Sequence, residues 1–237
     1  MSFWGTFYGV GVGPGDPQLL TLRAVQVLQS VPVIAIPKSR LDRESVAWEI
    51  ARPHCNAGAT LLELELPMTS DQAILAAAWR EAAAAILVKL QTGLSVAFIT
   101  LGDPSLYSTY NYLVQELNPL VPAGIIETIP GISALSLAAA RLNIPLAVGD
   151  EPLLILPSAE DVDNYLGFAN LVLMKVSRRL PRLLDKLTKA GKDYVLATRL
   201  GQQGEKIRRQ PDLSEMGSEK IDYLSLLLVK NGKMEGN

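Results

Sequence analysis

The chain has 237 residues, of which 49% are hydrophobic, and a formal net charge of −2. This length and composition suffice for a substantial core in one large or two small domains. The charge lacks the basic footprint of a nucleic-acid-binding protein. One cysteine and one histidine, Cys55 and His54, exclude an internal disulfide and a Cys/His metal site, and because they are adjacent we expect a loop rather than a catalytic pair.

No targeting or membrane-spanning segment is apparent in the sequence. The N-terminus lacks a basic region followed by a clean apolar run, which a secretory signal requires. No uncharged apolar run approaches the ~20 residues that span a bilayer. We therefore expect a cytoplasmic protein.

The chain opens with an apolar strand at residues 6–12 that leads into a turn rich in glycine and proline, residues 11–17. The turn does not fit the dinucleotide fingerprint GxGxxG, because Pro14 or Asp16 falls where the third glycine should be. A phosphate-binding GxxxxGK[ST] loop is absent as well. The turn therefore allows close backbone approach to a ligand without being built around a pyrophosphate.

The rest of the first half alternates strands and helices. We expect a helix after residue 18, strands at 31–36 and 61–66, a capped amphipathic helix at 70–91 and a strand at 96–99. Short connections in this order predict a parallel sheet with helices on both faces. Two prolines and a glycine at 119–124 predict a boundary between domains at 1–119 and 120–237.

A second tight turn, Leu101-Gly102-Asp103-Pro104, follows the strand at 96–99. Ligands of α/β sheets sit at the carboxyl ends of strands, and glycine lets the backbone come close to them. On local sequence alone an ordinary strand-to-helix turn is the simpler interpretation, and the similar turn at residues 11–17 favours a ligand site. The residues that follow, Ser105, Ser108 and Thr109, are of helix-capping types and precede a helix at 110–117.

The second half predicts a separate α/β domain of mixed strand direction. We expect strands at 125–129, 153–156, 171–176, 194–198 and 223–229, and helices at 135–142 and 180–187. The last two strands have no obvious helix between them, which favours antiparallel pairing. With ligand-type turns at 11–16, 101–104 and 130–134, we expect two α/β domains, a parallel N-terminal sheet and a mixed C-terminal sheet, and an active site in the cleft between them.

These three turns resemble the motifs of a known family. Gly11-Val12-Gly13-Pro14-Gly15-Asp16, then Gly102-Asp103-Pro104, then Pro130-Gly131-Ile132-Ser133-Ala134 are similar, in this order, to the tetrapyrrole (corrin/porphyrin) methylases. The resemblance covers nearly the whole chain. It implies two α/β domains, S-adenosylmethionine as cofactor and a homodimer. Residues 102–109 and 36–39 look most like members that methylate a precorrin at a meso carbon.

The resemblance also implies the site. Cofactor-binding residues carried over from the family's motifs are Pro14, Leu101, Gly102, Asp103 and Leu106, then Ser133 and Ala134 from the second domain, and finally Met174 and Gly201. For Met174, core packing in a strand is the alternative. Methyl transfer from a sulfonium needs positioning and exclusion of water but no metal, thiol or triad.

The remaining roles are hypotheses about individual side chains. Tyr107, with Asp103 behind it, is the candidate acceptor for the proton lost from the methylated carbon, and both residues could equally be structural. Lys38, Arg40 and Arg43 follow a strand and form either a solvated loop or a partner for the carboxylates of a tetrapyrrole. Two other functions compete: a methyltransferase of the same superfamily acting on ribosomal RNA or protein, and a non-enzymatic binding module.

Overall fold

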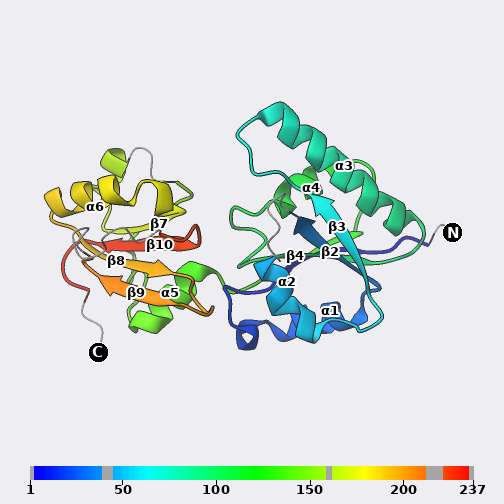
Figure 1. Ribbon diagram of the computed structural model, residues 1–237, viewed down its shortest axis with the longest axis horizontal. Coiled ribbons are helices and arrows are strands. Elements are labelled where there is room, and N and C mark those ends of the chain that lie inside the picture. Colours follow the sequence, from blue (N-terminus) through cyan, green and yellow to red (C-terminus); the bar gives the residue numbers. More distant parts are fainter. Residues whose placement is uncertain (1–2, 39–44, 159–161, 212–220, 235–237) are drawn as a thin grey trace. The chain divides into compact units, whose positions relative to one another are not determined.

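The computed structural model describes residues 3–38, 45–158, 162–211 and 221–234. It contains two compact units, residues 1–133 and 134–237, each with its own five-stranded sheet (Figure 1). Two α/β units, one parallel and one mixed, confirm the expected fold class. Within the described residues no helix has the length and apolar character needed to cross a membrane.

The sheet of the first unit is entirely parallel. Its strands are β1 (Phe7–Gly11), β2 (Val33–Lys38), β3 (Thr60–Glu65), β4 (Val96–Thr100) and β5 (Ile126–Ile129), in the spatial order β3-β2-β4-β1-β5. β1 lies between β4 and β5 and pairs with both in parallel. The two central strands β1 and β4 are almost fully buried, as expected for apolar runs covered on both faces.

Helices cover both faces of this sheet (Figure 1). On one face, α1 (Leu22–Ser30) and α2 (Val46–Ala51) pack against Val10, Ile34 and Ile99. On the other, α3 (Gln72–Gln91) and α4 (Tyr110–Leu117) pack against Phe7 and Phe98. Asp71 caps α3 by accepting hydrogen bonds from the amides of residues 73 and 74; the sequence allowed either Ser70 or Asp71 in this position.

The sheet of the second unit is mixed. Its strands are β6 (Leu153–Leu156), β7 (Asn170–Met174), β8 (Asp193–Thr198), β9 (Lys206–Arg209) and β10 (Ser225–Lys230), in the order β6-β7-β10-β8-β9. β6 and β7 are parallel, whereas β10 is antiparallel to β7 and to β8, as predicted for the last two strands recognised in the sequence. Helix α6 (Leu180–Lys189) buries four leucines on one face of the sheet, and the unit begins with α5 (Ala134–Leu142).

The structure differs from the sequence expectation in three places. Strand β5 joins the first sheet by pairing with β1, so the first unit extends to Ser133, beyond the boundary expected after residue 119. A parallel partner leaves no local signal in the sequence, because the pairing residues are far apart along the chain. Helix α2 and strand β9 were not predicted, since each is short, with six and four residues.

Candidate functional site

Three loops of the first unit begin at the carboxyl ends of three neighbouring strands. Residues 12–16 follow β1, residues 101–109 follow β4, and residues 130–133 follow β5. Because β4, β1 and β5 are adjacent and parallel, their carboxyl ends meet at one edge of the sheet. This is the edge at which α/β proteins bind ligands.

Glycine backbones hold the three loops in direct contact. Gly13 and Gly102 exchange two backbone hydrogen bonds, with N to O distances of 3.3 and 2.7 Å. A Cβ on Gly131 would lie 2.2 Å from the carbonyl oxygen of Gly102, and one on Gly11 would lie 2.7 Å from the same oxygen. Real Cβ atoms do not approach that closely, so this junction requires glycine at both positions.

The carboxylate of Asp103 connects two of these loops. Its Oδ1 accepts a hydrogen bond from the amide of Ser105 at 2.8 Å and contacts the Ser105 hydroxyl, while its Oδ2 accepts one from the amide of Gly131 at 2.9 Å. Both oxygens therefore bond to loop groups that lie 2 and 28 positions away along the chain. This arrangement favours a positioning role for Asp103, which is one of the two roles expected from the sequence.

Gly102 presents bare backbone at this edge. Its φ of +74° lies in the left-handed region, which favours glycine. A Cβ at this position would meet nothing closer than the Cα of Ser133, at 4.0 Å. The space that a side chain would fill is thus available to a ligand, which can approach the Gly102 backbone closely. The edge therefore leaves room for a small molecule against the main chain of Gly102.

Hydrogen bonds between side-chain hydroxyl groups connect the loop after β4, and the start of α4, to the sheet. Thr100 Oγ1 and the buried Ser108 Oγ are 2.9 Å apart, and Tyr110 Oη lies 2.8 Å from Thr128 Oγ1 on β5. Burial raises the pKa of the Tyr110 phenol, so it stays protonated as a structural group. Tyr107 has a φ of +52° and is 44% exposed, so the loop presents its ring toward solvent in a conformation that is uncommon for a bulky residue.

The structure brings together six predicted residues on these three loops and places three in the second unit. Pro14, Leu101, Gly102, Asp103, Leu106 and Ser133 belong to the first unit, so Ser133 does not lie in the second domain as expected. Ala134 is the first residue of α5. Met174 ends β7, and Gly201 follows β8 with a φ of +72° and donates its amide to Glu205 Oε2 at 2.6 Å.

Met174 and Gly201 lie at one edge of the second sheet. Leu226 of β10 pairs with Met174 on one side and with Ala197 of β8 on the other, so the carboxyl ends of β7 and β8 are level. Gly201 follows the end of β8 by three residues. The second unit therefore also gathers its predicted ligand residues at strand ends.

The basic residues predicted to contact the substrate are placed only in part. Lys38 ends β2, and its Nζ forms an ion pair with Glu63 Oε2 of the neighbouring strand β3 at 2.6 Å. Both side chains are about half exposed. Arg40 and Arg43 lie outside the residues that the structure describes. Carboxylate binding by these three cations remains a prediction.

The Cys55 thiol stays protonated at neutral pH. Burial raises the pKa of its thiol to about 11, and its Sγ donates to the carbonyl oxygen of Ala51 at 3.3 Å. A thiol that remains protonated at neutral pH is a poor nucleophile. Among the described residues no cluster of three or more His, Cys, Asp or Glu side chains could hold a metal ion.

Two features of the structure were missed by sequence reasoning. One is the bond between Asp103 and the Gly131 amide, which joins two motifs that had been treated separately. The other is a cluster of cations on β9, in a segment where no motif was recognised. The segment reads Glu205-Lys206-Ile207-Arg208-Arg209, in which a single apolar residue among charges gives no clear period-two pattern.

A parallel sheet whose carboxyl edge consists of glycine loops with open backbone defines an α/β protein that binds a small molecule at that edge. The comparison with known families agrees with this class. The family described as Tetrapyrrole (Corrin/Porphyrin) Methylases matches residues 6–216. The chain belongs to this family.

Individual relatives refine the comparison. The chain is 38% identical to the probable cobalt-precorrin-2 C(20)-methyltransferase of Methanocaldococcus jannaschii, covering 95% of this chain and 96% of that relative. It is 32% identical to the cobalt-precorrin-2 C(20)-methyltransferase of Salmonella typhimurium, with the same coverage.

Solved structures share the fold. A cobalt precorrin-4 methyltransferase, described as a cobalamin biosynthetic enzyme, has a TM-score of 0.74 at 20% identity, covering 95% of this chain and 94% of that chain. A uroporphyrin-III C-methyltransferase from Thermus thermophilus, complexed with S-adenyl homocysteine, has a TM-score of 0.63 at 23% identity, covering 95% of this chain and 97% of that one.

Proposed function

We propose that this protein is an S-adenosylmethionine-dependent methyltransferase that methylates the C(20) meso carbon of precorrin-2, or of its cobalt complex, in cobalamin biosynthesis. The observation that carries the proposal is the 38% identity, over nearly the full length of both chains, to a relative named for this reaction. The glycine-built loop edge supports it, because a methyltransferase of this kind needs a positioned cofactor and little side-chain chemistry.

S-adenosylmethionine is the cofactor that fits this edge. When bound, it supplies an electrophilic methyl group on a sulfonium that leaves as a neutral thioether. The space beside the Gly102 backbone lets the cofactor lie against the main chain without side-chain obstruction. A solved relative of similar fold is complexed with S-adenyl homocysteine, the product left after methyl transfer. The cofactor contacts carried over to Pro14, Leu106, Met174 and Gly201 remain part of this proposal.

The chain's own residues then have two tasks. The loop edge orients the reactants and keeps water away from them, which accounts for much of the acceleration of an in-line displacement. Asp103 holds the loops after β4 and β5 in register through Ser105 and Gly131. The carbon that gains the methyl group loses a proton, and Tyr107 is our candidate to take it up, its oxygen accepting that proton while its own hydroxyl proton passes to water.

The role of Tyr107 can be tested by removing its hydroxyl. We expect Tyr107→Phe to lower kcat about tenfold to a hundredfold while cofactor affinity is kept, because only proton transfer is impaired. Steady-state kinetics with the tetrapyrrole, together with calorimetric titration of S-adenosylmethionine, measure both quantities. Tyr112→Phe is the matched control, since Tyr112 is similarly exposed and its ring stacks on Trp79. Unchanged kcat in Tyr107→Phe would eliminate Tyr107 as the proton acceptor.

The substrate carries many carboxylates, for which Lys38, Arg40 and Arg43 are proposed partners. Guanidinium groups bind carboxylates in a bidentate manner. We expect Arg40→Ala and Arg43→Ala to weaken tetrapyrrole binding and to leave S-adenosylmethionine binding unchanged. Titration of each ligand separately tests this, and unchanged tetrapyrrole affinity in both variants would refute it.

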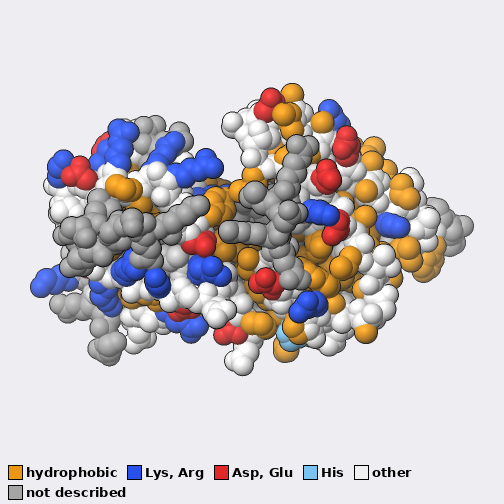
Figure 2. Space-filling view, viewed as in Figure 1, with side chains coloured by type: hydrophobic (Ala, Val, Ile, Leu, Met, Phe, Trp, Pro, Cys, Tyr) orange, Lys and Arg blue, Asp and Glu red, His pale blue; other side chains and the backbone are white. Residues whose placement is uncertain are grey.

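Homodimer formation and a cytoplasmic location are further parts of the proposal. The resemblance to the family supports the dimer, and so does helix α3, which buries only Ala82, Ala83, Ile86 and Leu90 while Ile74 and Val88 are more than half exposed. Figure 2 shows hydrophobic side chains spread over the first unit, beside Lys and Arg. Light scattering during gel filtration measures the oligomeric state.

Other functions predict different results in one experiment. The pure protein is incubated with S-adenosylmethionine and either precorrin-2 or its cobalt complex, and the molecular mass of the tetrapyrrole is then measured by mass spectrometry. Gain of a single methyl group on one of the two supports the proposal and selects the substrate. No gain with intact cofactor binding would point to another precorrin carbon, ribosomal RNA or protein. Loss of cofactor binding as well would point to a non-enzymatic module.

A further inference from the structure

The loop after β4 holds Tyr107 in a strained backbone conformation. Its φ of +52° lies in the left-handed region, which costs little for glycine or asparagine and is unfavourable for a bulky residue. Strained backbone of this kind persists only where the surrounding structure holds it, and it concentrates at functional sites. Two side chains of the same segment, Ser108 and Asn111, have contacts that can hold it.

Ser108 anchors the chain directly after Tyr107. Its side chain is buried, and its Oγ lies 2.9 Å from Oγ1 of Thr100, the last residue of β4. The same Oγ accepts a hydrogen bond at 3.2 Å from the amide of Tyr110, the first residue of α4. One hydroxyl group therefore fixes residue 108 against both a strand and a helix.

Asn111 closes the turn that contains Tyr107. Its Nδ2 donates to the carbonyl oxygen of Pro104 at 3.2 Å and to the carbonyl oxygen of Ser108 at 3.4 Å. These two carbonyl groups lie on either side of residues 105–107, so one side-chain amide joins the beginning of the turn to its end. Because Asn111 belongs to the first turn of α4, the helix provides a rigid base for both bonds.

Helix capping is the simplest competing explanation for these contacts. A serine near the start of a helix often accepts a hydrogen bond from a backbone amide, as Ser108 does from Tyr110. Such a cap needs neither the bond to Thr100 nor a bond from Asn111 to a carbonyl group seven residues earlier. These two additional bonds connect the chain on both sides of Tyr107 to β4 and to α4. They favour a role in fixing residue 107.

We propose that Ser108 and Asn111 are positioning residues, which hold Tyr107 in its left-handed conformation and thereby fix the direction of its side chain at the loop edge. The inference rests on the proposed role of Tyr107 as proton acceptor. A group that takes up a proton must be held close to the carbon that releases it, so loosening the turn slows the transfer. Ser108 and Asn111 act through Tyr107 and need no contact with the substrate.

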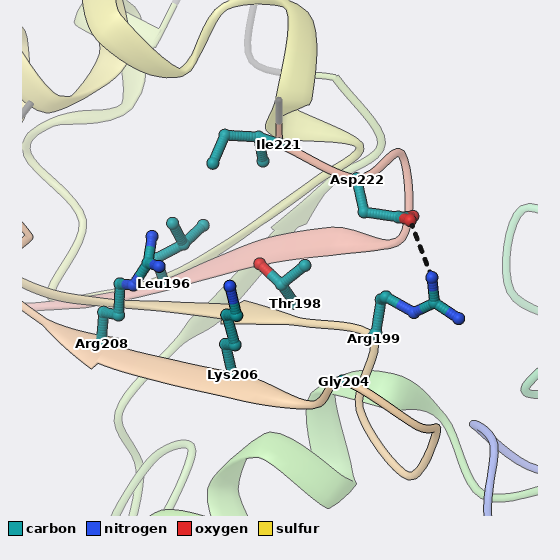
Figure 3. Close-up of a pocket in the computed structure, with 8 residues that line it drawn as sticks. All are labelled: Leu196, Thr198, Arg199, Gly204, Lys206, Arg208, Ile221 and Asp222. Atoms are coloured by element: carbon teal, nitrogen blue, oxygen red, sulfur yellow. Dashed lines mark ion pairs between the residues drawn. The ribbon is translucent and has the colours of Figure 1, made fainter. Parts of the chain in front are cut away.

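The second unit offers a matched control for Ser108. It contains a cavity of about 180 Å³ beside β9, and Thr198 and Asp222 are among the residues that line it (Figure 3). The buried Ser225 forms hydrogen bonds from its Oγ to Oγ1 of Thr198, at 3.1 Å, and to the carbonyl oxygen of Asp222, at 2.7 Å. Thr198 ends β8 as Thr100 ends β4. The substitution Ser225→Ala therefore removes the same kind of hydroxyl bond in the unit that does not contain Tyr107.

The key experiment is a double-mutant cycle on kcat, with whichever of precorrin-2 and its cobalt complex the wild type methylates. Ser108→Ala alone is expected to lower kcat about tenfold and to keep S-adenosylmethionine affinity within about twofold of the wild type. In the Tyr107→Phe background, which has already lost the hydroxyl, Ser108→Ala should lower kcat no further. Ser225→Ala should change kcat by less than about twofold, and by the same factor in both backgrounds.

Asn111→Ala tests the same turn at a half-buried position, so the inference stays testable if Ser108→Ala fails to fold. It removes the bonds to Pro104 and Ser108, and it should also lower kcat only where the Tyr107 hydroxyl is present. Thermal unfolding checks that each variant is folded. Hydrogen exchange at the amides of residues 105–107 reports the turn without any catalysis. We expect faster exchange in Ser108→Ala and Asn111→Ala, and unchanged exchange in Ser225→Ala.

Full kcat in both Ser108→Ala and Asn111→Ala would overturn the inference. An equal loss of kcat in the Tyr107→Phe background would overturn it too, because both residues would then act independently of Tyr107. If Tyr107→Phe itself keeps full kcat, the proposed proton acceptor is refuted, and only the conformational part of the inference stands. Unchanged hydrogen exchange in Ser108→Ala and Asn111→Ala would overturn that part.

Discussion

The loop edge of the first unit and the cavity of the second unit consist of different groups. In the first, the edge formed by the loops after β1, β4 and β5 is mainly backbone, with Gly11, Gly102 and Gly131 in contact and Asp103 as a connector. In the second, half of the described residues that line the cavity beside β9 carry charged side chains: Arg199, Lys206, Arg208 and Asp222. A backbone-built surface tolerates almost no substitution at its contact points, whereas exposed lysine and arginine can be exchanged with little cost in folding free energy.

This difference explains which parts of the molecule are recognisable in sequence. Close backbone contact requires glycine at fixed positions, so the loops appear as short motifs. The cations of β9 need only alternate along a strand and leave no fixed motif. The contrast between the two surfaces can be tested by substitutions that break one without changing the other.

The largest effect is expected from Gly131→Ala. Its new Cβ would lie 2.2 Å from the carbonyl oxygen of Gly102, so the loops after β4 and β5 must separate. We expect a loss of about 3 kcal/mol in the free energy of unfolding and loss of measurable S-adenosylmethionine binding. Urea denaturation and calorimetry measure the two effects.

The control for this substitution is Gly167→Ala. A Cβ on Gly167 would meet no atom within 4 Å, and its φ does not lie in the left-handed region. We expect a change of no more than about 0.5 kcal/mol. Similar losses in both variants would contradict the view that the loop junction, rather than glycine in general, is sensitive.

A smaller loss is expected from Asp103→Asn. The side-chain nitrogen of asparagine donates and cannot accept a hydrogen bond, so either Ser105 or the Gly131 amide loses its acceptor. We expect about 1–2 kcal/mol of lost stability and cofactor affinity lowered by about tenfold. Asp71→Asn is the matched control, because asparagine caps a helix as well as aspartate does. Full cofactor affinity in Asp103→Asn would show that the connection between the loops is dispensable.

The smallest expected effect is a pH dependence of the free energy of unfolding of the first unit, caused by Cys55. The pKa of Cys55 is raised from about 9 to about 11, so between these values the unfolded chain releases a proton that the folded chain keeps. The contribution to stability is thus complete below pH 9 and is lost as the pH rises toward 11. Because the thiol is only half buried, we expect this loss to be no more than about 1 kcal/mol.

The substitution Cys55→Ala removes this titrating group, so comparing the variant with the wild type isolates its contribution to stability. Denaturation of wild type and variant at pH 8 and pH 10.5 should give a steeper alkaline decline for the wild type. Equal declines would mean that other groups of the first unit, such as the buried phenol of Tyr110, account for the alkaline loss.

Much of the fold could be predicted because its signals are local. Helix α4 begins and ends at the expected residues, and the apolar stripe of α6 faces the core as its leucine spacing indicates. The assignment of β5 could not be predicted, because parallel pairing with β1 depends on residues more than a hundred positions apart. The first unit therefore ends later than the proline-rich segment suggested.

The candidate site could be predicted at the level of loops but not of contacts. Glycine and proline marked all three turns, and the family resemblance attached a cofactor to them. The bond from Asp103 to the Gly131 amide depends on how two strands align, which their local sequences do not specify. The cations beside β9 were missed for a similar reason, since a four-residue strand is recognised mainly by its partner β8.

The central position of β1 has a consequence for how the protein is made. Strand β1 pairs with β4 and β5, which follow it in the sequence by about 90 and 120 residues and are synthesised later. Both edges of this apolar strand are paired only after the chain has been synthesised as far as residue 129. Until then its exposed edges are prone to aggregate. A nascent chain released at residue 119 would keep one edge of β1 open, whereas one released at residue 133 would contain the whole first sheet.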